Sequence, residues 1–247
     1  MSFTFHSLPK NYRALVIGAT GGLGRAFTQH ILQDPKNGAV FAASRNPEAV
    51  QGLQSISMDI TQEVSIRDAI AQATIDGPLH LVIIATGLLH QDAAIQPEKT
   101  WRHLDADTLA RVFQINTIGP ALIAKHALPA LDRSNRSIFA ALSARVGSIS
   151  DNRLGGWHSY RASKSALNQI IRTCSIELAR KNKSALCVGL HPGTVDTKLS
   201  DPFQGNVPDG KLFTPDYSAQ SLLSVLDELD SQESGQCFDW AGAIINP

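Results

Sequence analysis

Two patterns of apolar residues alternate along this chain. In the first, short and mostly apolar runs are bounded by turn-forming residues, as expected for strands that are buried on both faces. In the second, apolar residues recur every three or four positions over longer segments, which predicts amphipathic helices. The predicted strands are 14–17, 40–43, 56–58, 79–85, 137–142, 185–190 and, at one edge, 238–245. The predicted helices are 23–31, 66–73, 106–128, 160–181 and 218–229.

The order of these elements indicates the fold class. Apolar strands that alternate with helices predict a central parallel sheet covered by helices on both faces, which is the doubly wound, Rossmann-type α/β fold. In such folds ligands bind beyond the carboxyl ends of the strands. We therefore expect the chemistry in the turns that follow Ile17, Ala43, Ala85, Leu142 and Leu190.

The composition narrows the range of partners. Lysine plus arginine and aspartate plus glutamate both number 22, so the chain lacks the positive field expected for binding nucleic acid or an anionic membrane. No apolar run is long enough to span a membrane, and residues 1–11 do not resemble a signal peptide. The 3 cysteines have no Cys-x-x-Cys spacing and the 8 histidines no metal-ligand spacing. We expect a cytoplasmic protein with buried thiols and no metal, in which residues 1–247 form one domain.

The turn after the first predicted strand is rich in glycine. Gly18, Gly22 and Gly24 fit the spacing G-x-x-x-G-x-G, and Gly18, Gly21 and Gly24 fit G-x-x-G-x-x-G. Glycine lets the backbone approach a pyrophosphate, and the free N–H groups at the start of the next helix attract its charge. The turn predicts a dinucleotide-binding site, although an ordinary tight turn can have the same composition.

The end of the second predicted strand bears on which cofactor is bound. Sites for NAD usually carry an acidic residue there, which binds the ribose 2′-hydroxyl. Here the chain reads Ala43-Ser44-Arg45-Asn46, and Ser44 with Arg45 could bind a 2′-phosphate through charge-assisted hydrogen bonds. This favours NADP over NAD; the alternative is an arginine that is only solvated at the surface.

Tyr160 and Lys164 lie four residues apart on a predicted helix and therefore share one face. A free phenol has a pKa of about 10, and a nearby ammonium favours the phenolate. We expect Lys164 to lower the pKa of Tyr160, which could then exchange a proton with a carbonyl or alcohol oxygen. Ser143, after the preceding strand, could hydrogen-bond the same oxygen, and Asn116 is a polar residue in an apolar helical stretch. Alternatively, the tyrosine and lysine are exposed, and Asn116 bonds only to water or backbone.

Taken in order, these motifs resemble the classical short-chain dehydrogenase/reductase family over nearly the whole chain. The resemblance includes the glycine turn, Asn116-x-x-Gly119, the serine after the fifth strand, Tyr160-x-x-x-Lys164 and Pro192-Gly193. The context Gly147-Ser148-Ile149 and the run Tyr-Arg-Ala-Ser-Lys-Ser-Ala-Leu-Asn resemble its carbonyl-reductase-like branch, which includes C-factor-like signalling proteins.

The resemblance implies further roles. Lys164 would also bind the nicotinamide ribose, and Asn116 would help to hold a water chain to that lysine. Asp59 resembles the family aspartate beside the adenine, although it could instead cap the next helix. The residues expected to bind the cofactor are Gly18, Thr20, Gly21, Gly22, Leu23, Gly24, Ser44, Arg45, Asp59, Ile60, Ala85, Thr86, Gly87, Lys164, Pro192, Gly193, Val195 and Thr197.

Two positions depart from the family pattern. Where the family has Asn-Asn-Ala-Gly after the fourth strand, this chain has Ile84-Ala85-Thr86-Gly87, so Thr86 becomes a candidate contact to the cofactor. The family's catalytic serine usually lies three residues before a glycine, and that position is Ala144 here. Ser143 could serve if the turn is rearranged, and Ser148 is a weaker substitute.

These inferences predict an enzyme that transfers hydride between NADP, or NAD, and a small carbonyl or alcohol substrate. Segment 198–215, which is rich in glycine and proline, is expected to be a mobile lid that selects the substrate. The resemblance implies a homodimer or homotetramer. Its interface would lie on the apolar helices around Asn116 and after Tyr160, although the same apolar faces could instead fill the core of a monomer. The alternative is a cofactor-binding signalling or regulatory protein with little or no turnover. An epimerase or dehydratase of the extended type is disfavoured, because about 100 further residues would be expected.

Overall fold

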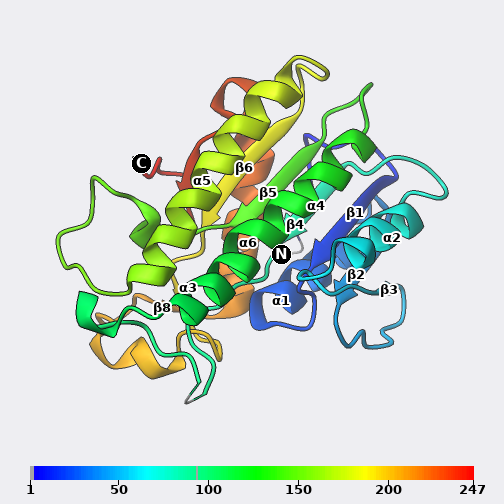
Figure 1. Ribbon diagram of the computed structural model, residues 1–247. Coiled ribbons are helices and arrows are strands. Elements are labelled where there is room, and N and C mark those ends of the chain that lie inside the picture. The colour runs from blue at the N-terminus through cyan, green and yellow to red at the C-terminus, as the bar shows by residue number, and fades with distance from the viewer. Residues whose placement is uncertain (1–2, 93) are drawn as a thin grey trace.

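The computed structural model describes residues 3–92 and 94–247, and its centre is a parallel sheet (Figure 1). The order of the seven strands is β3-β2-β1-β4-β5-β6-β9. Their bounds are β1 (Tyr12–Ile17), β2 (Asn37–Ser44), β3 (Gln54–Ser57), β4 (Leu81–Ile84), β5 (Ile138–Leu142), β6 (Leu186–His191) and β9 (Cys237–Asp239). Because the chain winds outward in opposite directions from β1 and β4, a crevice lies beyond their carboxyl ends.

Helices cover both faces of this sheet (Figure 1). They are α1 (Gly22–Gln33), α2 (Glu63–Ala73), α3 (Ala106–Phe113), α4 (Gly119–Ala127), α5 (His158–Ala179) and α6 (Pro215–Glu228). Helices α1 and α6 pack against each other on one face of the sheet. Helices α2, α4 and α5 pack on the other face. The predicted doubly wound fold is confirmed.

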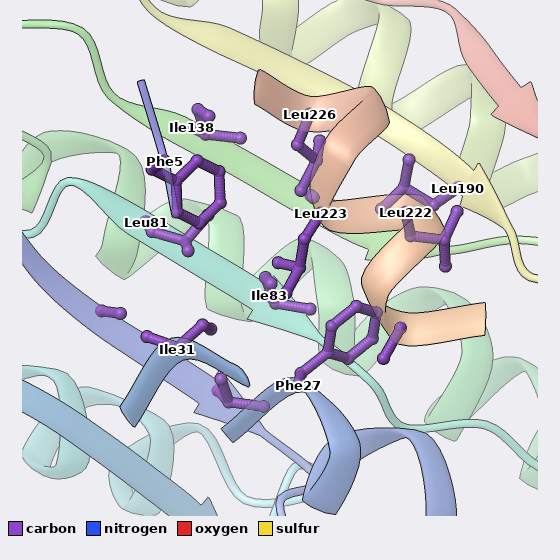
Figure 2. Packing of buried hydrophobic residues seen from close by; sticks show 14 of the residues in the cluster. Phe5, Phe27, Ile31, Leu81, Ile83, Ile138, Leu190, Leu222, Leu223 and Leu226 are labelled. Carbon is purple, nitrogen blue, oxygen red and sulfur yellow. The ribbon is translucent and has the colours of Figure 1, made fainter. Parts of the chain in front are cut away.

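The apolar strands are buried because both of their faces are covered. Along β1, Val16 contributes to the core under α1 and α6, while Ile17 contributes to the core under α2, α4 and α5. Figure 2 shows the first of these cores, in which Phe27 of α1 and Leu223 of α6 lie close to Ile83 of β4. These two layers fix the carboxyl ends of the strands, from which the site is built.

The long helix predicted over 106–128 is interrupted. A π-helical turn, Gln114–Ile118, separates α3 from α4, and the N–H of Gly119 donates to the carbonyl of Gln114. Pro120 explains the interruption, because a proline inside a regular helix has no N–H to donate to the carbonyl four residues earlier. A π turn is frequent at functional sites, and this one contains Asn116.

Two other predictions need correction. The edge strand expected over 238–245 is only β9, because the chain turns at Gly242 and Ile244 returns to form an antiparallel bridge with Phe238. The lid predicted over 198–215 contains short regular elements, which its glycine and proline content did not predict. It contains a 3-10 helix, Asp201–Asn206, and a short strand β8 (Leu212–Phe213), which pairs in parallel with β7 (Thr194–Val195).

Candidate active site

Three adjoining hollows lie beyond the carboxyl ends of the central strands. The central cleft, of about 820 Å³, is lined by the glycine turn, Thr86, Tyr160 and Lys164. A second hollow of about 490 Å³ extends from the same turn towards Ser44, and we call it the β2-side hollow. A third, the apolar hollow of about 210 Å³, lies on the other side of Tyr160 and is lined mainly by apolar side chains. The strand ends therefore meet at one site, as the sequence predicted.

The glycine turn owes its shape to the absence of side chains. Gly18 has a φ of 84°, and a Cβ on Gly24 would lie only 2.0 Å from the carbonyl oxygen of Gly18. A Cβ on Gly22 would lie 2.6 Å from Cγ2 of Thr197, which lines the central cleft opposite the turn. Helix α1 begins here without a side-chain cap and without an acidic residue in its first turn. Its N-terminus is therefore suited to bind an anionic group.

Polar side chains gather in the β2-side hollow. Ser44 is buried, and within the described part of the chain its Oγ has no hydrogen-bond partner. Arg45 is exposed beside it and lines the same hollow, as does Arg111 of α3, which the sequence analysis did not single out. An orphaned hydroxyl and two cations at this point fit the adenosine ribose of a nicotinamide dinucleotide.

Asp59 lies in the same hollow, where it shapes the turn after β3. Its carboxylate accepts hydrogen bonds from the N–H of Thr61 at 2.9 Å and from Thr61 Oγ1 at 2.8 Å. The bond from the Thr61 N–H is the main reason that the pKa of Asp59 is lowered. The alternative role of Asp59 as the cap of the next helix is wrong. The N-cap of α2 is Gln62, and the side chain of Gln62 makes no capping hydrogen bond. Ile60 packs beneath the neighbouring Gly119.

The predicted contacts to the nicotinamide half of a dinucleotide divide between two hollows. Thr86 lines the central cleft, and its buried Oγ1 has no hydrogen-bond partner among the described residues. Pro192 lies between the central cleft and the apolar hollow. Gly193 and Val195 line only the apolar hollow. The other predicted contacts, Thr20, Gly21, Leu23, Ala85, Gly87 and Thr197, line the central cleft. Together with Ser44, the orphaned Thr86 hydroxyl indicates that these residues fit a nicotinamide dinucleotide.

Tyr160 and Lys164 occupy the first two turns of α5, and both are buried, which excludes the exposed alternative. The Lys164 Nζ lies 5.7 Å from the centre of the Tyr160 ring and donates a hydrogen bond to the carbonyl oxygen of Leu142 at 2.7 Å. Burial lowers the pKa of Lys164 to about 8. Burial also raises the pKa of Tyr160, so the expected lowering by Lys164 is not found. The loss of solvent around the phenol is the cause of this shift.

Asn116 ties the π turn to the loop after β4. Its Oδ1 accepts a hydrogen bond from the N–H of Leu88 at 2.7 Å, and its Nδ2 donates to the Leu88 carbonyl at 2.8 Å. The Nδ2 also lies 3.0 Å from Ser163 Oγ on α5. A Cβ on Gly87 would lie 3.8 Å from Lys164 Nζ and 3.9 Å from Asn116 Oδ1. Asn116 thus holds the loop beside Lys164. The alternative of a residue bonded to backbone is met in part, because two of its partners are the main-chain groups of Leu88, although its bond to Ser163 is to a side chain.

The three candidate positions for the serine differ clearly. Ser143 lines both the central cleft and the apolar hollow together with Tyr160. Its Oγ donates a hydrogen bond to Oδ1 of Asn168 on α5 at 2.6 Å. Ala144 lies in an apolar cluster against Tyr160, whereas Ser148 lines none of the three hollows and bonds to the N–H of Asp151. Among the three, only Ser143 brings a hydroxyl to the site.

The start of α5 is held by a buried carboxylate that the sequence analysis missed. Glu98 is 3% exposed, and it accepts hydrogen bonds from the N–H of Ser159 at 3.1 Å and from Ser159 Oγ. Its backbone carbonyl accepts the N–H of Trp157 at 2.6 Å, and Trp157 has a φ of 53°. A carboxylate at a helix N-terminus is favourable, and here it comes from a segment 61 residues earlier. No local sequence pattern could reveal such a pairing.

Aromatic side chains form the wall of the apolar hollow, and these too were not predicted. The rings of Trp157 and Phe203 are 4.9 Å apart, and they pack in one cluster with Leu89, Ala144 and Tyr160. Phe203 belongs to the 3-10 helix Asp201–Asn206. Segment 198–215 therefore contributes directly to the hollow beside Tyr160.

Residues 3–92 and 94–247 contain no group of three or more histidine, cysteine, aspartate or glutamate side chains that could hold a metal ion. No helix within these ranges has the length and apolar character needed to cross a membrane. All three cysteines are free; Cys187 and Cys237 are buried, whereas Cys174 is only partly buried.

Comparison with known proteins gives the chain a family. The family model described as short chain dehydrogenase matches residues 12–207. The C-signal protein of Myxococcus xanthus is 36% identical over 142 residues, which cover 58% of this chain and 80% of that protein. The 1-hydroxy-2-glutathionyl-2-methyl-3-butene dehydrogenase of a Rhodococcus species is 29% identical over 90% of this chain and 93% of its own.

Solved structures agree with this match. The NADPH-bound carbonyl reductase from chicken fatty liver superposes with a TM-score of 0.82 at 26% identity, and the alignment covers 100% of both chains. The carbonyl reductase Sniffer of D. melanogaster shares the fold, with a TM-score of 0.80 at 22% identity over 96% of this chain and 100% of its own. Because the family model matches well over half of the sequence, the chain belongs to the short-chain dehydrogenase family of oxidoreductases.

Proposed function

We propose that this protein is an NADPH-dependent carbonyl reductase in which Tyr160 donates the proton. The observation that carries the proposal is the position of Tyr160, which lines both the central cleft and the apolar hollow, with Ser143 beside it in both. A carbonyl group in the apolar hollow would have its oxygen within reach of both hydroxyls. Relatives whose names describe a dehydrogenase and carbonyl reductases support this class of reaction.

The chain offers a complete set of groups for the cofactor. The glycine turn and the N-terminus of α1 would bind the pyrophosphate, and Thr86, Thr197 and Lys164 would bind the nicotinamide half. Ser44 and Arg45 would bind the 2′-phosphate, which makes NADP the preferred cofactor. When bound, the nicotinamide supplies the hydride that reduces the carbonyl carbon.

The protonation states suit Tyr160 as a proton donor in the proposed reduction. Because burial raises the pKa of Tyr160, the phenol keeps its proton at neutral pH and acts as a donor to the carbonyl oxygen. Lys164 is largely charged below pH 8, since its pKa is about 8, and its charge stabilises the phenolate left after proton transfer. Ser143 would hydrogen-bond the same oxygen and hold it against Tyr160 once its hydroxyl proton turns from Asn168 Oδ1 to the substrate.

The remaining features suggest how the protein is organised. Residues 1–247 would act as one domain, with 198–215 as the lid over the apolar hollow. The lid is tethered by a hydrogen bond between His90 Nε2 and the carbonyl oxygen of Lys198 at 3.0 Å. Ile118 and Ile176 are exposed on the helical face around α4 and α5, where the interface of a homodimer or homotetramer would lie. Three free thiols suit the reducing cytoplasm.

The test is NADPH oxidation by the purified protein with a panel of aldehydes, ketones and 1,2-diketones. Tyr160→Phe removes only the phenolic hydroxyl, so turnover should fall at least a hundredfold while the Kd for NADPH stays within twofold of wild type. Tyr217→Phe is the matched control, because this tyrosine is half exposed on α6 and lines none of the three hollows. A Tyr160→Phe protein that reduces the panel at the wild-type rate would refute the mechanism.

Cofactor preference has its own test. Arg45→Glu places a carboxylate where a 2′-phosphate would be bound, so the ratio of kcat/KM with NADPH to that with NADH should fall at least tenfold. An unchanged ratio would mean that Arg45 is only a solvated surface residue.

The similarity to C-signal favours a second candidate function, that of a signalling protein that binds the cofactor and has little or no turnover. The same panel separates the two. Tight binding of NADPH without oxidation of it by any carbonyl compound would favour the signalling role.

A further inference from the structure

We propose that Phe203 limits the size of the substrate, because its ring forms part of a wall between the apolar hollow and a larger groove. This groove, of about 850 Å³, is lined by residues 96–99, His103 and part of the lid, and we call it the outer groove. Among the described residues that line the two spaces, only Trp157 and Phe203 are shared. Their rings lie 4.9 Å apart and pack edge to face, so the wall consists of two side chains. The inference rests on the proposed function, because it assumes that the carbonyl group of the substrate lies beside Tyr160.

The apolar hollow has room for one ring. Its volume is about 210 Å³, and a closed apolar cavity of roughly 150 Å³ is enough to hold benzene. Two linked rings would need roughly twice the volume of that cavity. At Pro192 the hollow adjoins the central cleft, which the nicotinamide half of a bound cofactor would occupy. A carbonyl compound with one ring therefore fits in the hollow, whereas a second ring would have to pass through the wall.

The Trp157 half of the wall is fixed by the main chain. Its N–H donates to the carbonyl of Glu98 at 2.6 Å, and its φ is 53° at the point where α5 begins. The carboxylate of Glu98 in turn accepts the N–H of Ser159 at 3.1 Å. A change at Trp157 would therefore disturb the start of the helix that carries Tyr160, which makes this residue unsuitable as a test of substrate size.

The Phe203 half of the wall belongs to the lid, where it can be changed separately. Its N–H donates to the carbonyl of Ser200 at 2.8 Å, and its ring packs edge to face against that of His90 at 5.7 Å. Phe203 packs in the small cluster around Tyr160 and belongs to neither core of the sheet. We therefore expect Phe203→Ala to join the apolar hollow to the outer groove while the sheet and α5 keep their places.

The experiment compares benzaldehyde with 4-phenylbenzaldehyde, which has the same reacting group and one additional ring. With NADPH and the wild-type protein, we expect kcat/KM for the two-ring aldehyde to be at least tenfold lower than for benzaldehyde. In Phe203→Ala the ratio of the two-ring to the one-ring value should rise at least tenfold, because the second ring gains access to the outer groove. Activity with benzaldehyde should stay within fivefold of wild type, which shows that the variant is folded.

Two control variants separate the size of the ring from other effects. Phe203→Leu keeps part of the side-chain volume and should give a smaller rise in the ratio than Phe203→Ala. Trp101→Ala removes an aromatic ring that is 70% exposed and lines neither space, so the ratio should stay at the wild-type value. If the wild-type protein reduces both aldehydes equally well, or if Phe203→Ala leaves the ratio unchanged, the inference is wrong.

A binding measurement tests the same wall without turnover. Benzamide and 4-phenylbenzamide carry a carbonyl group that the nicotinamide does not reduce, and calorimetry in the presence of NADPH gives the Kd of each. The wild-type protein should bind benzamide at least tenfold more tightly, and Phe203→Ala should remove this preference. Equal affinities in the wild type, or binding of neither amide, would overturn the inference. Failure of the proposed function looks different, because then the amides bind with this preference but no carbonyl compound causes oxidation of NADPH.

Discussion

Replacing Lys164 by methionine should abolish turnover and, at pH 7, stabilise the folded chain. Lys164 is 2% exposed, and burial lowers its pKa to about 8 from an ordinary value of 10.5. The pKa is thus lowered by roughly 2.5 units. This means that folding disfavours the charged form of the side chain by about 3 kcal/mol. Loss of the hydrogen bond to the Leu142 carbonyl would cost about 1 kcal/mol, so a net gain of about 2 kcal/mol remains.

The gain in stability of Lys164→Met over wild type should decrease as the pH rises. Below pH 8 the lysine is charged in both the folded and the unfolded chain, and the full penalty of burying the charge is present. Between about pH 8 and pH 10.5 the folded state loses the proton while the unfolded state keeps it, so the penalty disappears. The wild-type protein therefore becomes more stable relative to Lys164→Met as the pH rises through this window.

Thermal unfolding at several pH values is the assay. At pH 7 the melting temperature of Lys164→Met should exceed that of wild type by about 5 °C, and the difference should shrink towards zero near pH 10. Lys183→Met, which removes an exposed lysine, should change the melting temperature little at either pH. If Lys164→Met is less stable than wild type at pH 7, or if the difference does not vary with pH, the buried charge is not the costly group that we infer.

Three further outcomes follow from the same site. With a carbonyl substrate, kcat/KM should be level around neutral pH and fall above an apparent pKa near 8, as Lys164 loses its charge; a level profile up to pH 10 would contradict this. Gly24→Ala should destabilise the fold by about 3 kcal/mol and weaken NADPH binding, because its Cβ would lie 2.0 Å from the Gly18 carbonyl oxygen; an unchanged melting temperature would show that the turn can relax. Glu98→Ala should lower the free energy of unfolding by about 2 kcal/mol, because it removes the charged acceptor of the Ser159 N–H. Calorimetry of Glu98→Gln should show a smaller decrease in this free energy.

The sheet was predictable from the sequence because its strands are buried on both faces. Such strands must be apolar at consecutive positions, and parallel strands bring the turns at their ends to one edge. Ser143 and Tyr160 could therefore be assigned to one site although β5 and α5 are separate elements. The π turn could not be foreseen, because its apolar periodicity continues that of the flanking helices. Only Pro120 marked it.

Contacts between distant segments were beyond the reach of sequence patterns. The bond from Ser159 to Glu98 and the packing of Phe203 on Trp157 depend on how two loops cross the start of α5. The Tyr-x-x-x-Lys spacing correctly indicated one helical face, but the predicted direction of the tyrosine pKa was wrong. Spacing states how close two groups lie, whereas the pKa depends also on how much water the fold removes from both.

That correction bears on how the proposed proton transfer would be assisted. An oxidation would use the phenolate of Tyr160 as the base, and a reduction would produce the same phenolate, so the raised pKa of Tyr160 makes stabilisation of this phenolate important in both directions. A reduction begins with the phenol protonated and creates a phenolate only as the carbonyl oxygen takes the proton. The buried ammonium of Lys164 then stabilises the negative charge of the phenolate. This attraction between the two charges is strong because the site contains little water. The burial that makes the tyrosine a poor base in the resting protein thus strengthens the influence of the lysine on the phenolate that the proposed proton transfer would create.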